Sequence, residues 1–557
     1  WTGNRITCRD WFQLCLKEGL TVFRDQQFSA DERSAAVQRI GDVRALRARQ
    51  FREDAGPLAH PVRPEEYIEI NNFYTATVYE KGAEVIRMLH TLIGPEAYRK
   101  GTDLYFERHD GHACAIEDWI KVFEDGTGRD LGQFALWYSQ AGTPELRVTE
   151  DWADGTFTLT MAQSSKPTPG RESKAPQVIP VAIGLLGADG SEVRPTHVVE
   201  LTDAEQAFGF EGLSERPVAS VLRGFSAPVI LSHDVDDTAR TFLLAHDTDP
   251  FNRAEAGREL GLNIALAVID GGDVPESWSA ALGSLLADPA LDPAFKALVL
   301  DAPLQEEVAV RLTADSVPVD PAIVFKAVTR MRAALGAALE DDLVSAYRAH
   351  TVEGPYAPDA KSAGQRALQN RCLALLAAAG PRGIAMAEEQ LAASNSMSMT
   401  LPALYALANN GAPSLDGHLD AFHDRWQSDP LVIDKWLMLQ ASIQDGEALS
   451  RVEKLTEHPS FDWKNPNKFR SLIGVFAMMN ATGFHAPDGA GYKFFTDWLL
   501  KLDALNPQTT ARLAGVFETW TRYAPVLRSL MKAEMERIVA APDLSKNTRE
   551  IVERILG

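Results

Sequence analysis

The sequence predicts a multidomain protein with a mainly helical N-terminal part, a small β-sandwich and a large, irregular α-superhelical part. Three observations predict this fold class. At 557 residues the chain is too long for one hydrophobic core. Its apolar periodicity changes from helical to alternating near residue 144 and back near residue 244. Beyond that point, proline repeatedly interrupts runs rich in leucine and alanine. We therefore expect domains over 1–143, 144–243 and 244–557.

The first of these domains carries several helix signals. Ser29 and Glu32 have the spacing of a capping box, which predicts that a helix starts at this serine. A helical apolar stripe occupies the segment that Gly94 and Pro95 terminate. Three further helices are expected near residues 95–108, 116–125 and 130–140.

The second and third domains differ in their pattern. Residues 144–243 contain short segments rich in Val, Thr and Phe, separated by turn signals such as Asp154-Gly155, and this spacing predicts a small β-sandwich. After residue 244, prolines such as Pro381 and Pro402 punctuate helical runs. Because no fixed period is visible, we expect stacked helix pairs in an irregular superhelix.

Composition excludes several classes of partner. The 77 acidic and 55 basic residues give a formal charge of −22, which repels nucleic acid and anionic membranes. Four cysteines without a C-x-x-C pair, and no apolar run of about twenty residues, favour a cytoplasmic protein. The first residue is Trp1 rather than methionine, so we expect the chain to be a fragment or a processed product.

Motif searches do not reveal a complete active site. The sequence contains no G-x-x-x-x-G-K-[ST], no G-x-G-x-x-G and no G-x-S-x-G. A P-loop, a Rossmann cofactor site and an α/β-hydrolase serine therefore lose support. The zinc-binding pattern H-E-x-x-H is also absent from the given residues.

Glu18, in "DWFQLCLKEGLTVF", is the most unusual polar residue. Its neighbours at helical spacing include Leu14 and Val22, so its carboxylate faces an apolar layer. An ionised acid is costly there unless it is paired or bound to a metal. Spacing alone favours a buried salt bridge with Arg9 or Arg24 and leaves a metal ligand as the other interpretation.

Longer segments resemble a known family. "WTGNRITCRDWFQLCLKEGLTVFRDQQF", "IEINNFYTATVYEKGAEVIRMLHTLIG", "YFERHDG" and "WYSQAGTP" resemble the aminopeptidase N family of zinc gluzincins, the bacterial alanyl aminopeptidases. "NPNKFRSLIGVFAMMNATGFHAPDGAGYKFF" and "NPQTTARL" are similar to the C-terminal helical domain of the same family. The resemblance runs from Trp1 nearly to the end, and it implies that residues 1–143 are the second half of a thermolysin-like catalytic domain.

The resemblance also implies a metal ligand. In this family, zinc is held by the two histidines of H-E-x-x-H and by a glutamate in a following K-E-G or N-E-G segment. Lys17-Glu18-Gly19 matches that segment, so Glu18 would be the third ligand. The family spacing places H-E-x-x-H just upstream of Trp1, and with it the glutamate that acts as general base. We therefore expect the isolated chain to bind zinc poorly and to be inactive.

The remaining implied site residues surround the substrate. Tyr79, in V-Y-E-K-G, matches the tyrosine that donates to the oxyanion, whereas without the resemblance it reads as a core tyrosine. Asn71 and Tyr74 fall where the family shapes the zinc pocket and the first substrate pocket, although both could simply cap and pack a helix. Arg470 and Arg522 are candidates for the substrate's C-terminal side, with surface salt bridges as the alternative. The family's G-x-M-E-N loop is absent.

Two functions are therefore compared. The first is a zinc metalloaminopeptidase that releases N-terminal amino acids from peptides by attack of a zinc-activated water. Its partners would be peptides with a free N-terminus, without nucleic acid or membrane, and we expect a monomer. The alternative is a non-catalytic helical-solenoid interaction module derived from the same family. Retention of both Glu18 and Tyr79 favours the enzyme, because packing does not require that pair.

Overall fold

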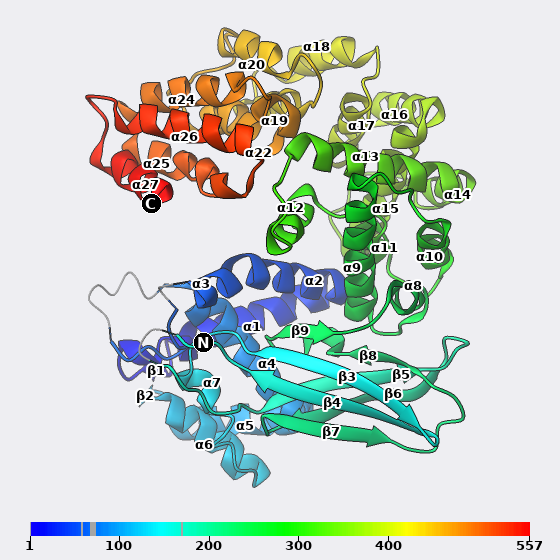
Figure 1. The fold of residues 1–557 in the computed structure, drawn as a ribbon, viewed down its shortest axis with the longest axis vertical. Helices are drawn as coiled ribbons and strands as arrows, with labels where there is room; N and C mark the ends of the chain where they lie inside the picture. The colour runs from blue at the N-terminus through cyan, green and yellow to red at the C-terminus, as the bar shows by residue number, and fades with distance from the viewer. Residues whose placement is uncertain (1, 57–58, 67–73, 169–170) are drawn as a thin grey trace. The chain divides into compact units, whose positions relative to one another are not determined.

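The computed structural model describes residues 2–56, 59–66, 74–168 and 171–557. They form two compact units (Figure 1). Unit 1 comprises Trp1–Leu260 and Pro289–Val299, and unit 2 comprises Gly261–Asp288 and Leu300–Gly557. Within the described residues, no helix is both long and apolar enough to span a bilayer.

The N-terminal part of unit 1 is mainly helical, as the sequence predicts, with one short parallel strand pair. The strands are β1 (Thr7–Cys8) and β2 (Ala113–Cys114). The helical segments are η1 (Trp11–Gln13), α1 (Cys15–Glu32), α2 (Ala35–Ala45), η2 (Leu46–Gln50), α3 (Phe51–Ala55), η4 (Thr77–Lys81), α4 (Gly82–Ile93), α5 (Pro95–His109), α6 (Ile116–Thr127) and α7 (Leu136–Ser139). Of these, η2 and η4 are π-helical turns, which are rare and are found frequently at functional sites.

The expected helix start at Ser29 is wrong. Ser29 and Glu32 lie in the last turn of α1, and the N-cap of α2 is Ser34, whose Oγ accepts from Val37 N at 3.3 Å. A capping box needs extended backbone at its first residue. Ser29 instead has helical backbone inside α1, which continues to Glu32.

The three later helices were predicted with unequal success. The helices expected near 95–108 and 116–125 are confirmed by α5 and α6. The helix expected over 130–140 is reduced to the short α7. Its first half forms turns, because the Asp130 side chain accepts from Gly132 N at 2.8 Å and competes with helical hydrogen bonding.

The expected β-sandwich is confirmed (Figure 1). One sheet has the strand order β7-β4-β3-β9 and the other β6-β5-β8; the β3–β9 pair is parallel and the other pairs are antiparallel. The strands are β3 (Glu145–Ala153), β4 (Thr156–Ser164), β5 (Ile179–Leu186), β6 (Glu192–Leu201), β7 (Glu205–Phe210), β8 (Val218–Val221) and β9 (Ile230–His233). Every residue of the central strand β5 is buried, and α4 lies against β5 and β6. The sandwich therefore supports the helix that follows Tyr79.

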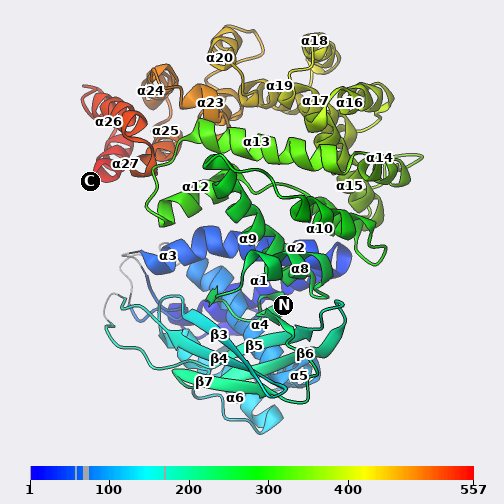
Figure 2. The same ribbon diagram turned by 45° about the vertical axis from the view of Figure 1, so that its right-hand side comes forward.

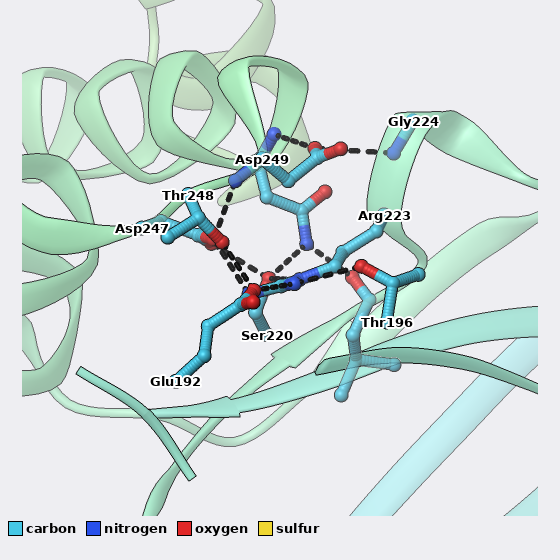
Figure 3. Close-up of polar contacts among 10 residues, drawn as sticks. Glu192, Thr196, Ser220, Arg223, Gly224, Asp247, Thr248 and Asp249 are labelled. Carbon is cyan, nitrogen blue, oxygen red and sulfur yellow. Dashed lines mark hydrogen bonds and ion pairs between the residues drawn. The ribbon is translucent and has the colours of Figure 1, made fainter. Parts of the chain in front are cut away.

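A buried polar network joins the sandwich to the helices that follow it, α8 (Asp237–His246) and α9 (Pro250–Ile269). At its centre, in the turn η5 (Arg223–Phe225), is Arg223, whose side chain is 2% exposed (Figure 3). Its guanidinium donates to Glu192 at 2.6 Å, Ser220 at 2.9 Å and Asp247 at 3.0 Å. Because a buried charge is costly unless paired, this network fixes where the chain leaves the sandwich.

Unit 2 is helical throughout, apart from its connections, and confirms the expected irregular superhelix of helix pairs (Figure 2). Unit 2 includes the second part of α9, from Gly261, whereas α11 (Pro293–Val299) belongs to unit 1. Its longer helices are α10 (Glu276–Ala287), α12 (Gln305–Ala314), α13 (Pro321–Ala338), α14 (Glu340–Ala349), α15 (Ala360–Ala379), α16 (Pro381–Ala393), α17 (Met397–Asn409), α18 (Leu415–Trp426), α19 (Pro430–Ser442), α20 (Ala448–Thr456), α24 (Ala490–Asp503), α25 (Pro507–Ala514), α26 (Pro525–Val539) and α27 (Lys546–Leu556). Shorter turns are α21 (Pro466–Phe469), η6 (Arg470–Gly474), α22 (Val475–Met479), α23 (Ala481–Phe484), η7 (Gly515–Phe517) and η8 (Trp520–Arg522).

Close packing of α15 and α16 depends on Gly383, since a Cβ there would lie 2.0 Å from the carbonyl carbon of Leu376.

Proline does not mark a helix boundary at every position where the sequence predicts one. Pro381 begins α16, but Pro402 lies inside α17. Proline frees the carbonyl four residues earlier, and the Asn370 side chain donates to that oxygen, Ser398 O, at 3.0 Å.

Acid should weaken one partly buried ion pair of unit 1, that of Glu255, whose side chain is 24% exposed. Burial raises the pKa of Glu255, but the charges of Arg47 and Arg258 outweigh burial and hold this pKa at about 2. We expect Glu255→Gln to lower the unfolding free energy by about 1–3 kcal/mol at neutral pH. The deficit should shrink as the pH falls from about 5 towards 2, because the unfolded carboxyl titrates near pH 4.3.

Urea unfolding at several pH values measures this deficit. Glu553→Gln in α27 is the matched control, because the Glu553 side chain is 54% exposed and its ion pair with Arg549 is long, at 3.7 Å. We expect the control to change the unfolding free energy little at any pH. A Glu255→Gln deficit that stays constant between pH 5 and pH 3 would contradict the assignment.

Candidate functional site

Glu18 lies in the first turn of α1, with its side chain 12% exposed. The chain turns into α1 through η1, where Asp10 accepts from Phe12 N at 3.0 Å. The salt bridge expected with Arg9 or Arg24 is wrong, because Arg9 pairs with Asp10 and Arg24 donates to Gln27. Glu18 instead pairs with its neighbour in sequence, Lys17, whose Nζ is 3.2 Å from Oε1.

Two glycines set the distance between the predicted metal ligand and the predicted oxyanion donor. Gly19 of the K-E-G segment packs directly on Gly82, which follows Y-E-K in the second motif. A Cβ on Gly19 would lie 2.8 Å from the carbonyl carbon of Gly82, so larger residues would force α1 and α4 apart. Glu18 and Tyr79 are therefore brought together by backbone contact between their own motifs.

Tyr79 lies in the π-helical turn η4, which leads directly into α4. The turn is fixed at its start, where the side chain of Glu53 accepts from Thr77 N at 2.8 Å and the side chain of Gln50 donates to Thr77 Oγ1 at 3.3 Å. Thr77 is completely buried. This anchoring gives the Tyr79 side chain a defined position.

Tyr79 and Glu18 interact electrostatically. Burial, and then the charge of Glu18 and a hydrogen bond with it, raise the pKa of the Tyr79 phenol to about 12. The phenol therefore stays protonated and can act as a hydrogen-bond donor at neutral pH. Tyr74 lies beside it, with ring centroids 6.3 Å apart, and is 47% exposed.

A buried ion pair that sequence reasoning missed supports this turn. Lys81, two residues after Tyr79, donates to Asp54 Oδ2 at 2.7 Å and to the carbonyl of Gly142 at 2.8 Å. Both charged side chains are 1% exposed. Asp54 also accepts from Gly142 N and from the Thr143 hydroxyl. The sequence indicates an unusual position for Lys81, because this lysine lies within a helical apolar pattern. The pattern does not identify Asp54 as its partner.

A second ion pair fastens α4 to the sandwich. Arg39 of α2 donates to both carboxylate oxygens of Glu84, each at 2.7 Å, and to the carbonyl of Gly224 at 2.9 Å. Bidentate pairs of this kind hold a specific geometry. The elements that carry Glu18 and Tyr79 are thus fixed to one another and to the sheet.

The structure gives less information on the roles of the other predicted site residues. Asn71 lies outside the described residues. In unit 2, Arg470 begins the π-helical turn η6 and is exposed, donating to Pro466 O at 3.2 Å and to the Asn467 side chain. Arg522 forms a bidentate pair with Glu306 at 2.7 and 2.8 Å. The salt bridge foreseen as an alternative is therefore present for Arg522.

The residues described do not by themselves make a metal site. In residues 2–56, 59–66, 74–168 and 171–557, no three histidine, cysteine, aspartate or glutamate side chains are grouped so that they could hold a metal ion. A zinc ion in a protein takes three or four such ligands. Glu18 fits one ligand position, since Lys17 is the only close cationic partner of its carboxylate among the residues that the structure describes.

Comparison with known proteins assigns each part of the chain. Residues 1–138 match the Peptidase family M1 domain. Residues 142–234 match a domain of unknown function, DUF3458, with an Ig-like fold, and residues 237–557 match its C-terminal companion, DUF3458_C, with ARM repeats.

Relatives that align with the whole of this chain agree with these matches. The chain is 49% identical over 563 residues to aminopeptidase N of Caulobacter vibrioides and 41% identical over 574 residues to aminopeptidase N of Escherichia coli. Both alignments cover 100% of this chain and 65% of the relative, so the chain spans less than two thirds of their length. The crystal structure of Legionella pneumophila aminopeptidase A in complex with aspartic acid superposes with a TM-score of 0.77 at 28% identity, covering 99% of this chain and 64% of that one.

Proposed function

The chain belongs to peptidase family M1 and is homologous to aminopeptidase N over its whole length, and on this premise we propose that it is part of a zinc aminopeptidase. The proposed reaction releases N-terminal amino acids from peptides. When bound, zinc would activate a water molecule and polarise the scissile carbonyl.

The convergence of Glu18 and Tyr79 carries this proposal. The two residues come from separate motifs, and the Gly19–Gly82 contact brings those motifs together. The effect of Glu18 on the pKa of the Tyr79 phenol supports a shared site. A carboxylate for the metal beside a neutral phenol for the developing oxyanion is the pair that peptide hydrolysis needs.

We propose that the remaining zinc ligands and the general base belong to a part of the full-length protein outside these 557 residues. Two facts support this division of the site. The relatives are longer than this chain, which covers 65% of each. The residues described offer Glu18 but no group of three metal ligands.

Zinc binding tests the role of Glu18. In the full-length protein, we expect one zinc per chain and hydrolysis of an alanine anilide. Glu18→Gln should weaken zinc binding at least about tenfold, because the neutral amide is a poorer ligand than the carboxylate. The 557-residue chain alone should show negligible hydrolysis.

Glu80→Gln is the matched control for this experiment. Glu80 is adjacent to Tyr79 but pairs with Arg49 at 3.3 Å, so its loss should leave the zinc content unchanged. Stoichiometric zinc and hydrolysis by the isolated chain would overturn the divided site. A full-length protein without zinc or peptidase activity would favour the alternative function, a non-catalytic interaction module.

Further parts of the proposal concern the surroundings of the site. We propose Tyr74, beside Tyr79, and Asn71 for the first substrate pocket, with Arg470 and Arg522 on the substrate's C-terminal side. The exposure of Tyr74 and of Arg470 supports access to a substrate. The formal charge of −22 supports a monomer without nucleic acid or anionic membrane partners, and the four cysteines without a C-x-x-C pair support a cytoplasmic location.

A further inference from the structure

A second concave site lies entirely within unit 2. It is a cavity of about 320 Å³ lined by residues of α14, α15, α16 and α17 and of the loop between α14 and α15. This volume is at the lower end of the range of small-molecule sites. None of the residues proposed for peptide hydrolysis lines it.

One wall of the cavity carries a buried cation, Arg366 of α15, which is only 7% exposed. Its Nη2 donates to the carbonyl of Ala357 at 2.7 Å, and its guanidinium carbon lies 4.6 Å from the ring centroid of Tyr356. Within the described part of the chain, no carboxylate forms an ion pair with it. Asp359, the nearest acid in sequence, caps α15 by accepting from Ser362 N, and it acts on Arg366 through its charge alone in the described structure.

Arg366 therefore has unused hydrogen-bonding capacity. A guanidinium has five N–H donors in a planar arrangement that matches a carboxylate or a phosphate. One carbonyl and one aromatic ring satisfy only part of this capacity. Because a buried charge is costly without an opposite charge, an anion entering the cavity would be stabilised.

The start of α17 adds a second, independent source of positive potential to the same cavity. Ser396 is the N-cap of this 13-residue helix, and its side chain makes no capping hydrogen bond. Both Ser396 and Met399 line the cavity. In the described structure, no side chain caps the first N–H groups of α17, and the helix dipole favours an anion there.

From these two features we propose that the cavity binds a small molecule through a carboxylate or phosphoryl oxyanion. The guanidinium of Arg366 and the N–H groups at the start of α17 bind the oxyanion. The exposed carboxylate of Glu389 lines the cavity as well and repels further negative charge, so polyanions are disfavoured. The remaining lining is uncharged and mixes polar side chains, such as Tyr347 and Ser394, with apolar ones, such as Val352 and Met399.

Binding of inorganic phosphate and of lactate to the 557-residue chain tests this proposal by calorimetry and thermal melting. Arg366→Gln removes the buried cation. Ser396→Asp places a carboxylate at the N-cap, where aspartate is favoured, so it occupies the anion position without weakening the helix. Each variant should weaken binding about tenfold or more, because a charged hydrogen bond is lost or an anionic competitor is introduced.

Arg382→Gln is the matched control. Arg382 is in α16 but pairs with Glu340 and Asp341 outside the cavity, so its loss should leave the affinity unchanged. Binding of lactate alone assigns a carboxylate ligand, and binding of phosphate alone assigns a phosphoryl ligand. A wild-type chain that binds neither probe at millimolar concentration overturns the proposal, as does unchanged affinity in Ser396→Asp. The second variant keeps the test decisive if Arg366→Gln unfolds.

Discussion

Replacing Tyr79 by phenylalanine in the full-length protein is expected to lower kcat for peptide hydrolysis about 10²–10³-fold. The substitution removes only the hydroxyl, and the buried Thr77 anchor and the Gly19–Gly82 contact should keep the ring in place. Loss of a donor to the developing oxyanion affects the transition state more than substrate binding, so KM should change little. Steady-state kinetics with an alanine anilide measures both constants.

Tyr98→Phe is the matched control for this measurement. It makes the same chemical change in the same unit, but the Tyr98 hydroxyl is buried without a hydrogen-bond partner in the described structure. We expect it to leave kcat close to that of the wild type. If Tyr79→Phe, with an unchanged zinc content, retained wild-type kcat, Tyr79 would not be the oxyanion donor.

Replacing Lys81 by methionine is expected to lower the unfolding free energy by about 3–5 kcal/mol. The change leaves Asp54 at 1% exposure without its paired cation, although the hydrogen bonds from Gln50, Gly142 and Thr143 remain. Burial raises the pKa of Asp54, but the charge and hydrogen bond of Lys81 lower it overall. Urea unfolding, followed by circular dichroism, measures the loss.

Two comparisons separate this effect from a general loss of charge. Arg49→Gln removes a cation from an ion pair with Glu80 in the same turn, but the Arg49 side chain is 68% exposed, so we expect a change of at most about 1 kcal/mol. The double variant Lys81→Met with Asp54→Leu should recover stability relative to Lys81→Met, because it leaves no unpaired buried charge. Equal losses in Lys81→Met and Arg49→Gln would contradict the buried-pair explanation.

Lys81 and Asp54 also illustrate what sequence reasoning could not find. The lysine was visible within the V-Y-E-K-G motif, but its partner lies in a separate segment, and Gly142 lies in a third. Periodicity reports which face of an element is apolar, not which distant residue meets it. For the same reason, periodicity predicts Arg9 or Arg24 as the partner of Glu18, whereas in the structure Glu18 pairs with Lys17.

Local rules failed at two places. Ser29 has an acceptable capping pattern, yet α1 continues through it to Glu32 and the N-cap of the next helix is Ser34. Pro402 should interrupt a helix, yet α17 continues because the freed Ser398 carbonyl accepts from the Asn370 side chain. At Pro402, a contact from another element therefore compensates for a local preference.

The sequence by itself determined the succession of helical, sandwich and superhelical parts, the resemblance to aminopeptidase N and the two candidate residues Glu18 and Tyr79, because these depend on periodicity and on short runs of residues. Only the tertiary structure decided how those residues meet. The Gly19–Gly82 contact, the Lys81–Asp54 pair and the cavity around Arg366 each join segments that are distant along the chain. Such contacts depend on which surfaces pack together in three dimensions, and no local pattern encodes that choice.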